Sequence, residues 1–394
     1  MTLLALLLVL AAIPSLIASC YLATLILLSR QEPGPQAAAP HLRFDFIVPS
    51  HNEEENIAQT VKALLAIDYP RELFRTLVVA DNCIDATAAR ALEAGAEVLV
   101  RNDQTLRGKG YALELAFQKS LEGKADAVVV IDADTVVTKN LLTAFAARIE
   151  KGAQAVQADY AVRNPDASWR TRLMSIAFSA FHQLRSTGRE RLGVSCGLRG
   201  NGMCFTRSVL GQVPHNAFSI VEDVEYGIRL GEAGIRVHHA GDAHVYGEMV
   251  SGEQASRSQR RRWEGGRMQL AKLHGPRLLE QSLARRSPLL LDLAIDVLMP
   301  PLSILALSDA AGFFVSLLLA FVGGPQLPLL PWGFCVLVLL AYVLRGWQIS
   351  GTGARGLRDL CFAPVYVIWK LVLSARGDSK PKEWVRTQRE DKKP

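Results

Sequence analysis

Two aspartates separated by one residue, Asp132 and Asp134, directly follow the apolar run at 127–131. Carboxylates at the end of a strand, where the chain turns, can reach one hard cation together. Their oxygen atoms suit Mg²⁺ or Mn²⁺ that is shared with a diphosphate group. Asp-x-Asp is also frequent in solvated turns, where an aspartate caps the backbone. The position after an apolar strand favours the metal site.

A second acidic pair, Glu222 and Asp223, begins a segment with helical spacing that extends to Leu230. The helix dipole stabilises acids in a first turn, and that effect alone is one explanation of the pair. The functional alternative is a general base that takes a proton from an acceptor hydroxyl group. Such a base contributes about 10²–10⁴-fold to a reaction rate.

Basic and aromatic residues are combined in the segment from Gln259 to Trp263. The arginines of this region lie close to an apolar part of the chain, so contact with anionic lipid would explain several of them. Arg262 beside Trp263 favours a second interpretation, in which the guanidinium binds a phosphate group. The indole then offers a face on which a sugar ring can stack.

Strands and helices alternate in the part of the chain that contains the first of these motifs. Strands are predicted at 44–49, 76–80, 97–100 and 127–131. Helices are predicted at 54–67 and 109–122, and a third helix follows the segment 81–87 and runs through Ala94. This alternation predicts an α/β domain with right-handed crossovers. Ligands of such sheets bind at the carboxyl ends of the strands. Those ends carry the polar segments 49–53, 81–85 and 132–134, so we expect the site at that edge.

The sequence lacks the signatures of several other kinds of site. No Gly-x-Gly-x-x-Gly follows the first strand and Gly-x-x-x-x-Gly-Lys-Ser/Thr is missing, so neither a dinucleotide fold nor a P-loop is predicted. The six cysteines form no Cys-x-x-Cys pair, which argues against a zinc site and a disulfide framework. The net charge is +6, but the basic residues concentrate beside apolar segments, so we predict no nucleic-acid partner.

Apolar segments at both ends of the 394-residue chain predict membrane helices. Residues 1–29 contain no charged side chain, and 302–322 and 327–344 are each long enough to cross a bilayer. Arginines follow the first segment, which predicts a cytoplasmic location for the central part of the chain. Asp309 lies inside 302–322 and must then face protein rather than lipid.

Two shorter apolar segments are predicted to lie at the membrane surface. Residues 289–299 contain Asp292 and Asp296, which share one face of a helix and would be costly to bury in lipid. Residues 360–373 are short and contain a proline and a lysine. We expect an interfacial helix in each case.

Seven motifs together resemble those of the family 2 inverting glycosyltransferases with a GT-A fold, particularly the membrane-integrated branch of cellulose, chitin and hyaluronan synthases. They occupy 47–54, 81–87, 108–113, 132–134, 200–202, 222–223 and 259–263. The similarity covers residues 44–265 and extends to the flanking apolar segments. It implies a Rossmann-like α/β domain of the nucleotide-diphospho-sugar transferase type, with transmembrane and interfacial helices on either side.

The resemblance implies a donor site for a nucleotide sugar, with UDP as the expected nucleotide. Its residues, from the uridine end to the diphosphate end, would be Pro49, Glu53, Asp81, Asp132, Lys109 and Arg262. Asp134, together with Asp132, would bind the Mg²⁺ or Mn²⁺ cofactor.

The resemblance also implies the catalytic and acceptor residues. Asp223 would be the base, with Glu222 beside it, and Gln259 and Trp263 would contact the acceptor. The segment from Lys382 to Thr387 resembles a stretch that returns to the active site in polymer synthases, but a basic cytoplasmic tail is an equal explanation.

These observations predict a multi-pass protein of the inner (plasma) membrane that transfers a sugar to an acceptor hydroxyl with inversion. The expected process is polysaccharide or oligosaccharide synthesis, with a glycan or a lipid-linked acceptor. Transfer of a single sugar to a polyprenyl phosphate or another lipid is the nearest alternative. A nucleotidyltransferase and a non-catalytic membrane scaffold or transporter are the remaining ones.

The expected division of the chain has four parts. They are a transmembrane helix at 1–29, a cytoplasmic GT-A domain at 30–286, interfacial helices with two transmembrane helices at 287–376, and a cytoplasmic tail at 377–394. Membrane lipid is an expected partner, and a second copy of the chain or a secretion protein are further candidates.

Overall fold

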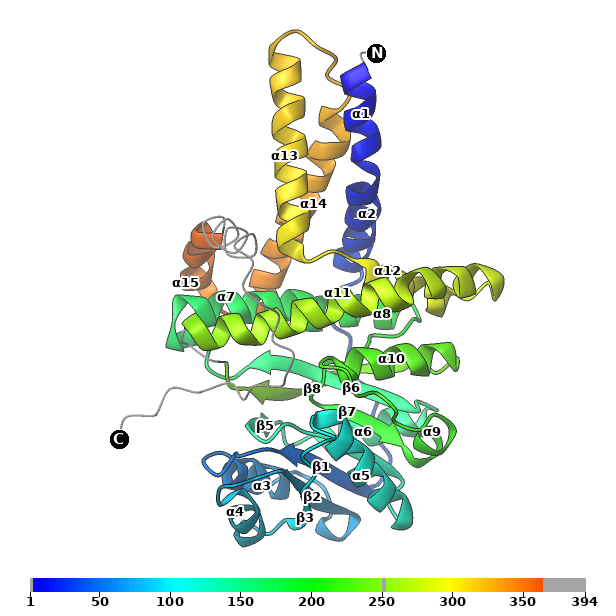
Figure 1. Cartoon of the computed structure of the whole chain (residues 1–394), viewed down its shortest axis with the longest axis vertical. Coiled ribbons are helices and arrows are strands. Elements are labelled where there is room, and N and C mark those ends of the chain that lie inside the picture. Colours follow the sequence, from blue (N-terminus) through cyan, green and yellow to red (C-terminus); the bar gives the residue numbers. More distant parts are fainter. Residues whose placement is uncertain (1–2, 250–252, 364–394) are drawn as a thin grey trace.

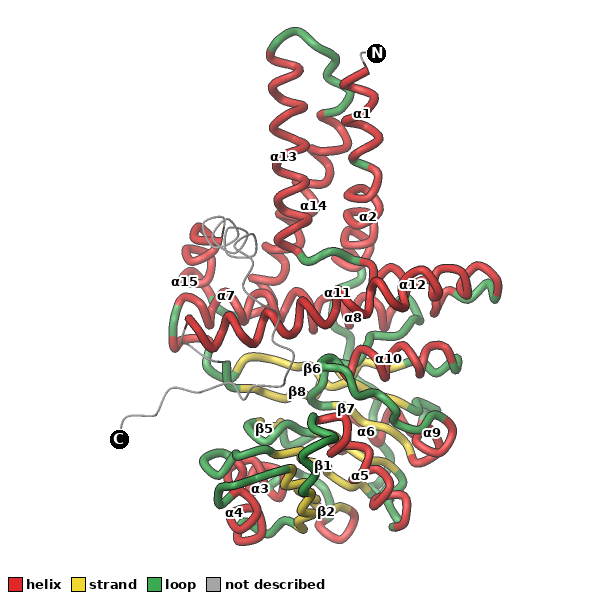
Figure 2. The backbone as a smooth tube through the Cα atoms, viewed as in Figure 1, coloured by secondary structure: helices red, strands yellow, loops and turns green. Residues whose placement is uncertain are grey.

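The computed structural model describes residues 3–249 and 253–363, except for the side chains of 253–262 and 264. Three parts follow one another along the long axis of the molecule (Figure 1). A sheet with its covering helices forms one end, a group of long helices forms the other, and a layer of helices lies between them. Figure 2 shows that the strands are confined to the first part.

Eight strands form one sheet in the order β3-β2-β1-β4-β7-β6-β8-β5. Their bounds are β1 Phe44–Ser50, β2 Phe74–Asp81, β3 Glu97–Arg101, β4 Ala127–Val130, β5 Thr135–Val137, β6 Ala155–Val162, β7 Met203–Thr206 and β8 Val237–Gly247. Strands β3, β2, β1 and β4 are parallel, as the alternating pattern predicts. Because β7 is antiparallel to β4 and β6, and β5 to β8, the second half of the sheet is mixed.

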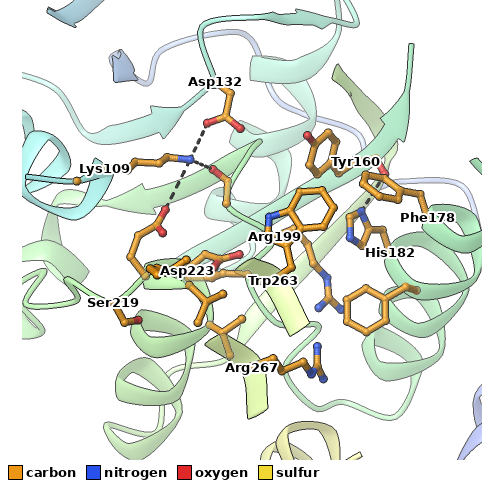
Figure 3. A pocket seen from close by; sticks show the side chains of 18 of the residues that line it. Lys109, Asp132, Tyr160, Phe178, His182, Arg199, Ser219, Asp223, Trp263 and Arg267 are labelled. Atoms are coloured by element: carbon orange, nitrogen blue, oxygen red, sulfur yellow. Dashed lines mark hydrogen bonds and ion pairs between the residues drawn. The ribbon is translucent and has the colours of Figure 1, made fainter. Parts of the chain in front are cut away.

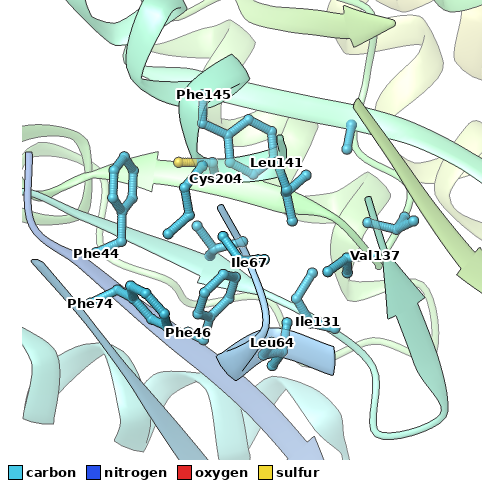
Figure 4. Packing of buried hydrophobic residues seen from close by; sticks show 14 of the residues in the cluster. Phe44, Phe46, Leu64, Ile67, Phe74, Ile131, Val137, Leu141, Phe145 and Cys204 are labelled. Atoms are coloured by element: carbon cyan, nitrogen blue, oxygen red, sulfur yellow. The ribbon is translucent and has the colours of Figure 1, made fainter. Parts of the chain in front are cut away.

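Helices cover both faces of the sheet, because successive residues of a strand point to opposite sides. Phe44, Phe46 and Val48 of β1 pack on one face with α3 (Ile57–Leu65) and α6 (Leu141–Glu150), as Figure 4 shows in part. Ile47 packs on the other face with α5 (Lys109–Glu122). The bounds of the helices in this part are η1 Arg71–Leu73, α3 Ile57–Leu65, α4 Thr87–Glu93, α5 Lys109–Glu122, α6 Leu141–Glu150, α9 Arg207–Gln212 and α10 Glu222–Glu232.

The middle layer is built mainly from two long helical segments. One runs through α7 Trp169–Phe178, the π-helical turn η3 Ser179–Leu184 and α8 Arg185–Arg191, and the other consists of α11 Glu253–Ala284 and α12 Pro288–Leu298. Ser168 starts the first segment with a reciprocal capping box to Thr171. Three short helices are also described: η2 Pro165–Ala167, α15 Gly353–Asp359 and η4 Leu360–Phe362.

In the described part of the chain, three helical segments are long and apolar enough to cross a membrane. They are α1 Leu3–Ala11 with α2 Ile13–Leu27, α13 Leu302–Phe321 and α14 Leu329–Ser350. Asp309 in α13 is fully buried, which confirms the prediction that it faces protein. The predicted surface segment at 289–299 forms α12, and its Asp292 and Asp296 are buried against arginines of the protein.

Candidate active site

One cavity of about 1710 Å³ extends from the carboxyl ends of β1, β2 and β4 to the long apolar helices. At the first end it is lined by residues that follow these strands, among them Asn82 and Asp132. At the other end it is lined by Leu22 of α2, Leu305 of α13 and Tyr342 of α14. The same space therefore connects the strand ends, where ligands of α/β sheets bind, with the apolar helices.

Lys109, the first residue of α5, lies among acidic side chains at the strand end of the cavity (Figure 3). Its Nζ lies 2.6 Å from Asp132 Oδ1, 2.5 Å from the carbonyl oxygen of Gly200 and 3.7 Å from Glu222 Oε1. Burial lowers the pKa of Lys109, but the neighbouring carboxylates of Asp132 and Glu222 raise it above its ordinary value. The ammonium group therefore stays charged, and it supplies one positive charge to several carboxylates.

A buried amide holds the turn that carries Asp132. Asn201 is fully buried, its Oδ1 accepts from the backbone N–H of Asp132 at 3.1 Å, and its Nδ2 donates to Thr135 Oγ1 at 2.8 Å. Gly200 precedes it with a φ of +77°, a left-handed conformation that favours glycine. That backbone places the loop against the carboxylate of Asp223, so the two acidic motifs meet across it.

Glu222 and Asp223 are the first two residues of α10, and both line the cavity. Burial raises the pKa of Glu222 to about 7, and it also raises the pKa of Asp223 above its ordinary value. The charges of Lys109 and Arg199 act on Asp223 in the opposite direction. A carboxylate whose pKa is raised towards neutrality is a better proton acceptor there than an exposed one.

Asp134 follows Asp132 after one residue and lines the same cavity. Among the described side chains, no group of three or more His, Cys, Asp or Glu residues is arranged to hold a metal ion. Asp132 and Asp134 would thus supply two carboxylates, and a bound diphosphate and water would supply the other oxygen ligands. Mg²⁺ is commonly held in this way, so the pair fits a divalent cation.

Pro49, Glu53 and Asp81 lie along the strand end of the cavity. Asp81 Oδ1 is 2.8 Å from Nη1 of Arg101 and 3.0 Å from Nδ2 of Asn82. Burial raises the pKa of Asp81, although the charge of Arg101 opposes this effect. These two donors fix the orientation of the Asp81 carboxylate at the cavity wall.

Trp263 is the member of the 259–263 motif whose side chain is described. It lines the cavity, and its ring centroid lies 6.1 Å from that of Phe178. Gln259 and Arg262 belong to α11, but their side chains lie outside the described residues. The segment from Lys382 to Thr387 lies outside them as well.

The predicted site residues with described side chains all line this one cavity. They are Pro49, Glu53, Asp81, Lys109, Asp132, Asp134, Glu222, Asp223 and Trp263. The fold thus brings together segments that are far apart along the chain, while the role of each residue stays a prediction.

Three further arginines, which were not predicted as site residues, line the cavity towards its apolar end: Arg185, Arg199 and Arg267. For Arg185, the sequence contained one signal of its role. Arg185 and Arg189 have the same four-residue spacing as the two aspartates of α12, and matched spacing on two helices allows two ion pairs when the helices pack side by side. Asn201 was also missed, because its role depends on a turn that is distant in the sequence.

Two curated relatives are similar to part of this chain. The probable glycosyltransferase YdaM of Bacillus subtilis is 25% identical over 229 residues, which cover 56% of this chain and 54% of the relative. The beta-monoglucosyldiacylglycerol synthase of Nostoc sp. is 26% identical over 193 residues, which cover 47% of this chain and 40% of the relative. The chain thus spans about half the length, or less, of these relatives.

Among solved structures, the mannosyltransferase PcManGT from Pyrobaculum calidifontis in complex with GDP-Man and Mn²⁺ has the same fold. It is 18% identical with a TM-score of 0.55, over 87% of this chain and 97% of that chain. The predicted fold class, a Rossmann-like α/β sheet of the GT-A type, is thereby confirmed. A family model matches residues 40–266, which is more than half of the chain. This range includes all the predicted site residues that line the cavity, from Pro49 to Trp263. This chain belongs to that family, glycosyltransferase like family 2.

Proposed function

We propose that this protein transfers a sugar from a nucleotide-sugar donor to an acceptor hydroxyl, with inversion at the anomeric carbon. The observation that supports it is the meeting of Asp132, Asp134 and Asp223 with Lys109 and Trp263 on the walls of one cavity. This set combines two candidate metal ligands, a base, a cation and an aromatic face. Those are the groups that such a transfer needs.

Asp223 is the proposed base. The acceptor oxygen attacks the anomeric carbon from the face opposite the nucleoside diphosphate, and the bond from that carbon to the diphosphate breaks as the new C–O bond forms. The proton of the hydroxyl passes to Asp223, and the bonding electron pair leaves with the diphosphate. Burial raises the pKa of Asp223, which brings its proton affinity closer to a neutral working pH.

Lys109 and the N-terminus of α5 are proposed to bind the diphosphate. Lys109 contributes a positive charge, and the first N–H groups of a helix favour an anion. Arg262 is proposed to bind the same group. Asp132 and Asp134 would hold Mg²⁺ or Mn²⁺, which when bound neutralises charge on the departing diphosphate.

Pro49, Glu53 and Asp81 are proposed to bind the nucleoside. UDP is the first candidate, because the motifs resemble those of UDP-sugar enzymes. The complex of PcManGT contains GDP-Man, so GDP is the second candidate.

The cavity supports a lipid acceptor better than a growing polymer. It continues past Trp263 to Leu22, Leu305 and Tyr342, so a molecule with a hydrocarbon chain can reach the base from the membrane side. The Nostoc relative is by its name a synthase of a glucosyl lipid. We therefore propose transfer to a membrane lipid, and we keep the extension of a polysaccharide or oligosaccharide, favoured by the motif at 259–263, as the alternative.

The proposed location is the inner (plasma) membrane, with several crossings. Three apolar helices within the described ranges are long enough to cross, and the arginines after residue 29 favour a catalytic domain in the cytoplasm. The proposed division of the chain stays at 1–29, 30–286, 287–376 and 377–394.

A product assay with the purified full chain in nanodiscs tests the proposed function. UDP- and GDP-sugars are offered in turn with Mg²⁺ or Mn²⁺ and a total lipid extract. We expect release of a nucleoside diphosphate and formation of a lipid that carries one sugar, and we expect EDTA to stop both. Long products would favour the polymer alternative, pyrophosphate release would indicate a nucleotidyltransferase, and no donor cleavage with any sugar would overturn the proposal.

A further inference from the structure

The membrane end of the cavity contains an unusual concentration of buried positive charge. Arg185 and Arg199 are 4% and 8% exposed, and Arg189 behind them is not exposed at all. Arg267 of α11 completes the group, and it lines the cavity together with Arg185 and Arg199. Because an uncompensated buried charge is very costly, each of these guanidinium groups needs a counter-charge.

The described side chains supply only part of that counter-charge. Asp292 Oδ2 accepts from Nη2 of Arg189 at 2.5 Å. Asp296 pairs with Arg185, with Nη1 of Arg189 at 3.2 Å and with Nη2 of Arg267 at 3.3 Å. Two carboxylates thus face four guanidinium groups, and the described part of the group carries an excess of two positive charges.

The excess of positive charge is clearest at Arg199. No carboxylate with a described side chain lies within ion-pair distance of it, and its Nη2 donates to the carbonyl oxygen of Cys196 at 3.0 Å. The Nε atoms of Arg199 and Arg185 are buried without a hydrogen-bond partner in the described part of the chain. Burial lowers the pKa of Arg199 to about 10, so the group remains charged at neutral pH.

One aromatic ring holds the three cavity arginines close to one another. The guanidinium carbons of Arg185, Arg199 and Arg267 lie 4.8, 4.5 and 4.9 Å from the ring centroid of Phe181. Phe181 belongs to the π-helical turn η3, a type of irregularity that is frequent at functional sites. Contact with a ring positions the cations without neutralising them, so their charge stays available to a ligand.

The surroundings of this arginine cluster, defined as Arg185, Arg199 and Arg267, indicate the shape of the ligand. On one side lies the proposed base, because Asp223 lines the same cavity and lies against Gly200, the residue that follows Arg199. On the other side the cavity is lined by Leu305 and the other apolar residues of the membrane helices. The site thus suits an anion that has an apolar tail on one side and a reacting group on the other (Figure 3 shows Arg199, Arg267 and Asp223).

We propose that the arginine cluster binds the phosphate group of an anionic lipid, and that this lipid is the acceptor whose hydrocarbon chain lies along Leu305 and the neighbouring membrane helices. Guanidinium groups donate two parallel hydrogen bonds to phosphate oxygens. The Nε–H groups of Arg185 and Arg199, which have no partner among the described residues, can each donate one of them. The inference rests on the proposed function, because it names the acceptor class of the same cavity.

Two kinds of lipid share this chemistry and differ in the reaction step. In a polyprenyl monophosphate, a phosphate oxygen attacks the anomeric carbon as the bond to the nucleoside diphosphate breaks, and no proton has to be removed. In a phosphatidyl lipid with a hydroxyl headgroup, the phosphate stays bound to the arginines. The hydroxyl then attacks, and its proton passes to Asp223.

A binding experiment without donor tests the phosphate site independently of catalysis. The full chain in nanodiscs is titrated with farnesyl phosphate, with dioctanoyl phosphatidylglycerol and with uncharged dioctanoylglycerol. We expect at least one phosphate lipid to bind more tightly than dioctanoylglycerol. In Arg199→Gln we expect that affinity to fall about 10- to 100-fold, as for the loss of a charged hydrogen-bond donor. In Arg199→Lys, part of the affinity should remain.

Arg277→Gln is the matched control, because Arg277 lies on the same helix as Arg267 but is exposed. It should bind all three lipids as the wild type does, and thermal unfolding checks that each variant is folded. Equal affinity for charged and uncharged lipids, or an equal loss in Arg277→Gln, would overturn the proposal. This outcome does not depend on whether any sugar is transferred.

A transfer experiment then separates the two lipids and the remaining alternative. The lipid that the wild type glycosylates, farnesyl phosphate or phosphatidylglycerol, identifies the acceptor, and with phosphatidylglycerol Asp223→Asn should lose its rate. In Arg199→Gln the KM for the lipid should rise while the KM for the donor is unchanged. A rise in the donor KM alone would mean that the arginines bind the donor diphosphate, and it would overturn the proposal.

Discussion

The two ends of the cavity carry opposite charge and are built from different parts of the chain. At the strand end, the carboxylates of Asp132, Glu222 and Asp223 surround the single ammonium group of Lys109. At the other end, Arg185, Arg189 and Arg267 share the two aspartates of α12, whereas Arg199 has no carboxylate partner among the described side chains. Each end is thus deficient in the charge that the other has in excess.

The same burial has opposite effects on the groups at the two ends. It raises the pKa of Glu222 and Asp223, and it lowers the pKa of Arg199 and Arg267. In both cases burial disfavours the charged form, and a ligand of opposite charge would relieve that cost. A cation at the strand end and an anion at the other end would therefore complete the charge balance of the cavity, with the proposed reacting bond between them.

Asp223→Asn should have the largest effect on the strand end. The amide cannot take the proton of an acceptor hydroxyl, so turnover with such an acceptor should fall about 10²–10⁴-fold. Donor binding, measured by calorimetry, should survive. Glu225→Gln in the same helical turn is the control and should retain its rate. Near-normal turnover of Asp223→Asn would remove the base from the mechanism.

Asp292→Ala should affect stability rather than chemistry. It leaves Arg189 buried with a smaller share of negative charge, and loss of one partner of a buried pair costs about 3–5 kcal/mol. Thermal unfolding in detergent measures the change. Asp166→Ala removes an exposed partner of Arg172 and should cost about 0–1 kcal/mol. Similar unfolding temperatures for both variants would show that the buried network does not hold the layers together.

Asp134→Ala should abolish the response to divalent metal and lower turnover. The loss of charge stabilisation at the departing diphosphate corresponds to about 10²–10³-fold in rate. The rate is measured across a range of Mn²⁺ concentrations, with Asp126→Ala at the far end of β4 as a control. An unchanged metal dependence would place the metal ligands elsewhere.

Arg199→Leu should separate binding from stability at the membrane end. Removal of a buried cation that lacks a carboxylate partner among the described side chains should raise the free energy of unfolding by about 1 kcal/mol. Use of the lipid acceptor should be lost at the same time. Chemical unfolding in detergent and the acceptor KM are the two measurements. A clear loss of stability would mean that Arg199 serves the fold rather than a ligand.

The pH profile should link the two ends with the smallest effect. Asp223 must be ionised to act as the base and burial raises its pKa, so kcat/KM should fall as the pH falls through that pKa. Arg199 lowers the same pKa, so Arg199→Gln should move this acidic limb to higher pH. Profiles of both proteins between about pH 5 and 9 show the shift. A limb at an unchanged position would contradict the electrostatic contact between the ends.

Much of the parallel half of the sheet could be predicted from local patterns. The predicted helix at 109–122 coincides with α5 Lys109–Glu122, and the predicted strands agree with β1 to β4 within a few residues. The three long apolar segments also have the expected lengths. These features depend on the spacing of apolar residues, which burial on one or two faces imposes directly on the sequence.

The mixed half of the sheet could not be predicted in the same way. Strands β5, β6 and β8 pair with partners that are distant in the chain, and a pairing register is set by packing rather than by local spacing. Packing of distant segments also sets two contacts that local patterns do not predict. They are the hydrogen bond from the Asp132 backbone N–H to Asn201 and the ion pair of Arg189 with Asp292.

Local patterns of residues therefore predict the kinds of chemical groups, the strand ends that carry Asp132 and Asp134, and the apolar helices. Tertiary packing brings those acids into one cavity with the arginine cluster and extends that cavity to the apolar helices. The reason is physical. Local periodicity reports which face of an element is buried, whereas the charge that a buried Arg199 faces depends on which distant segments pack around it.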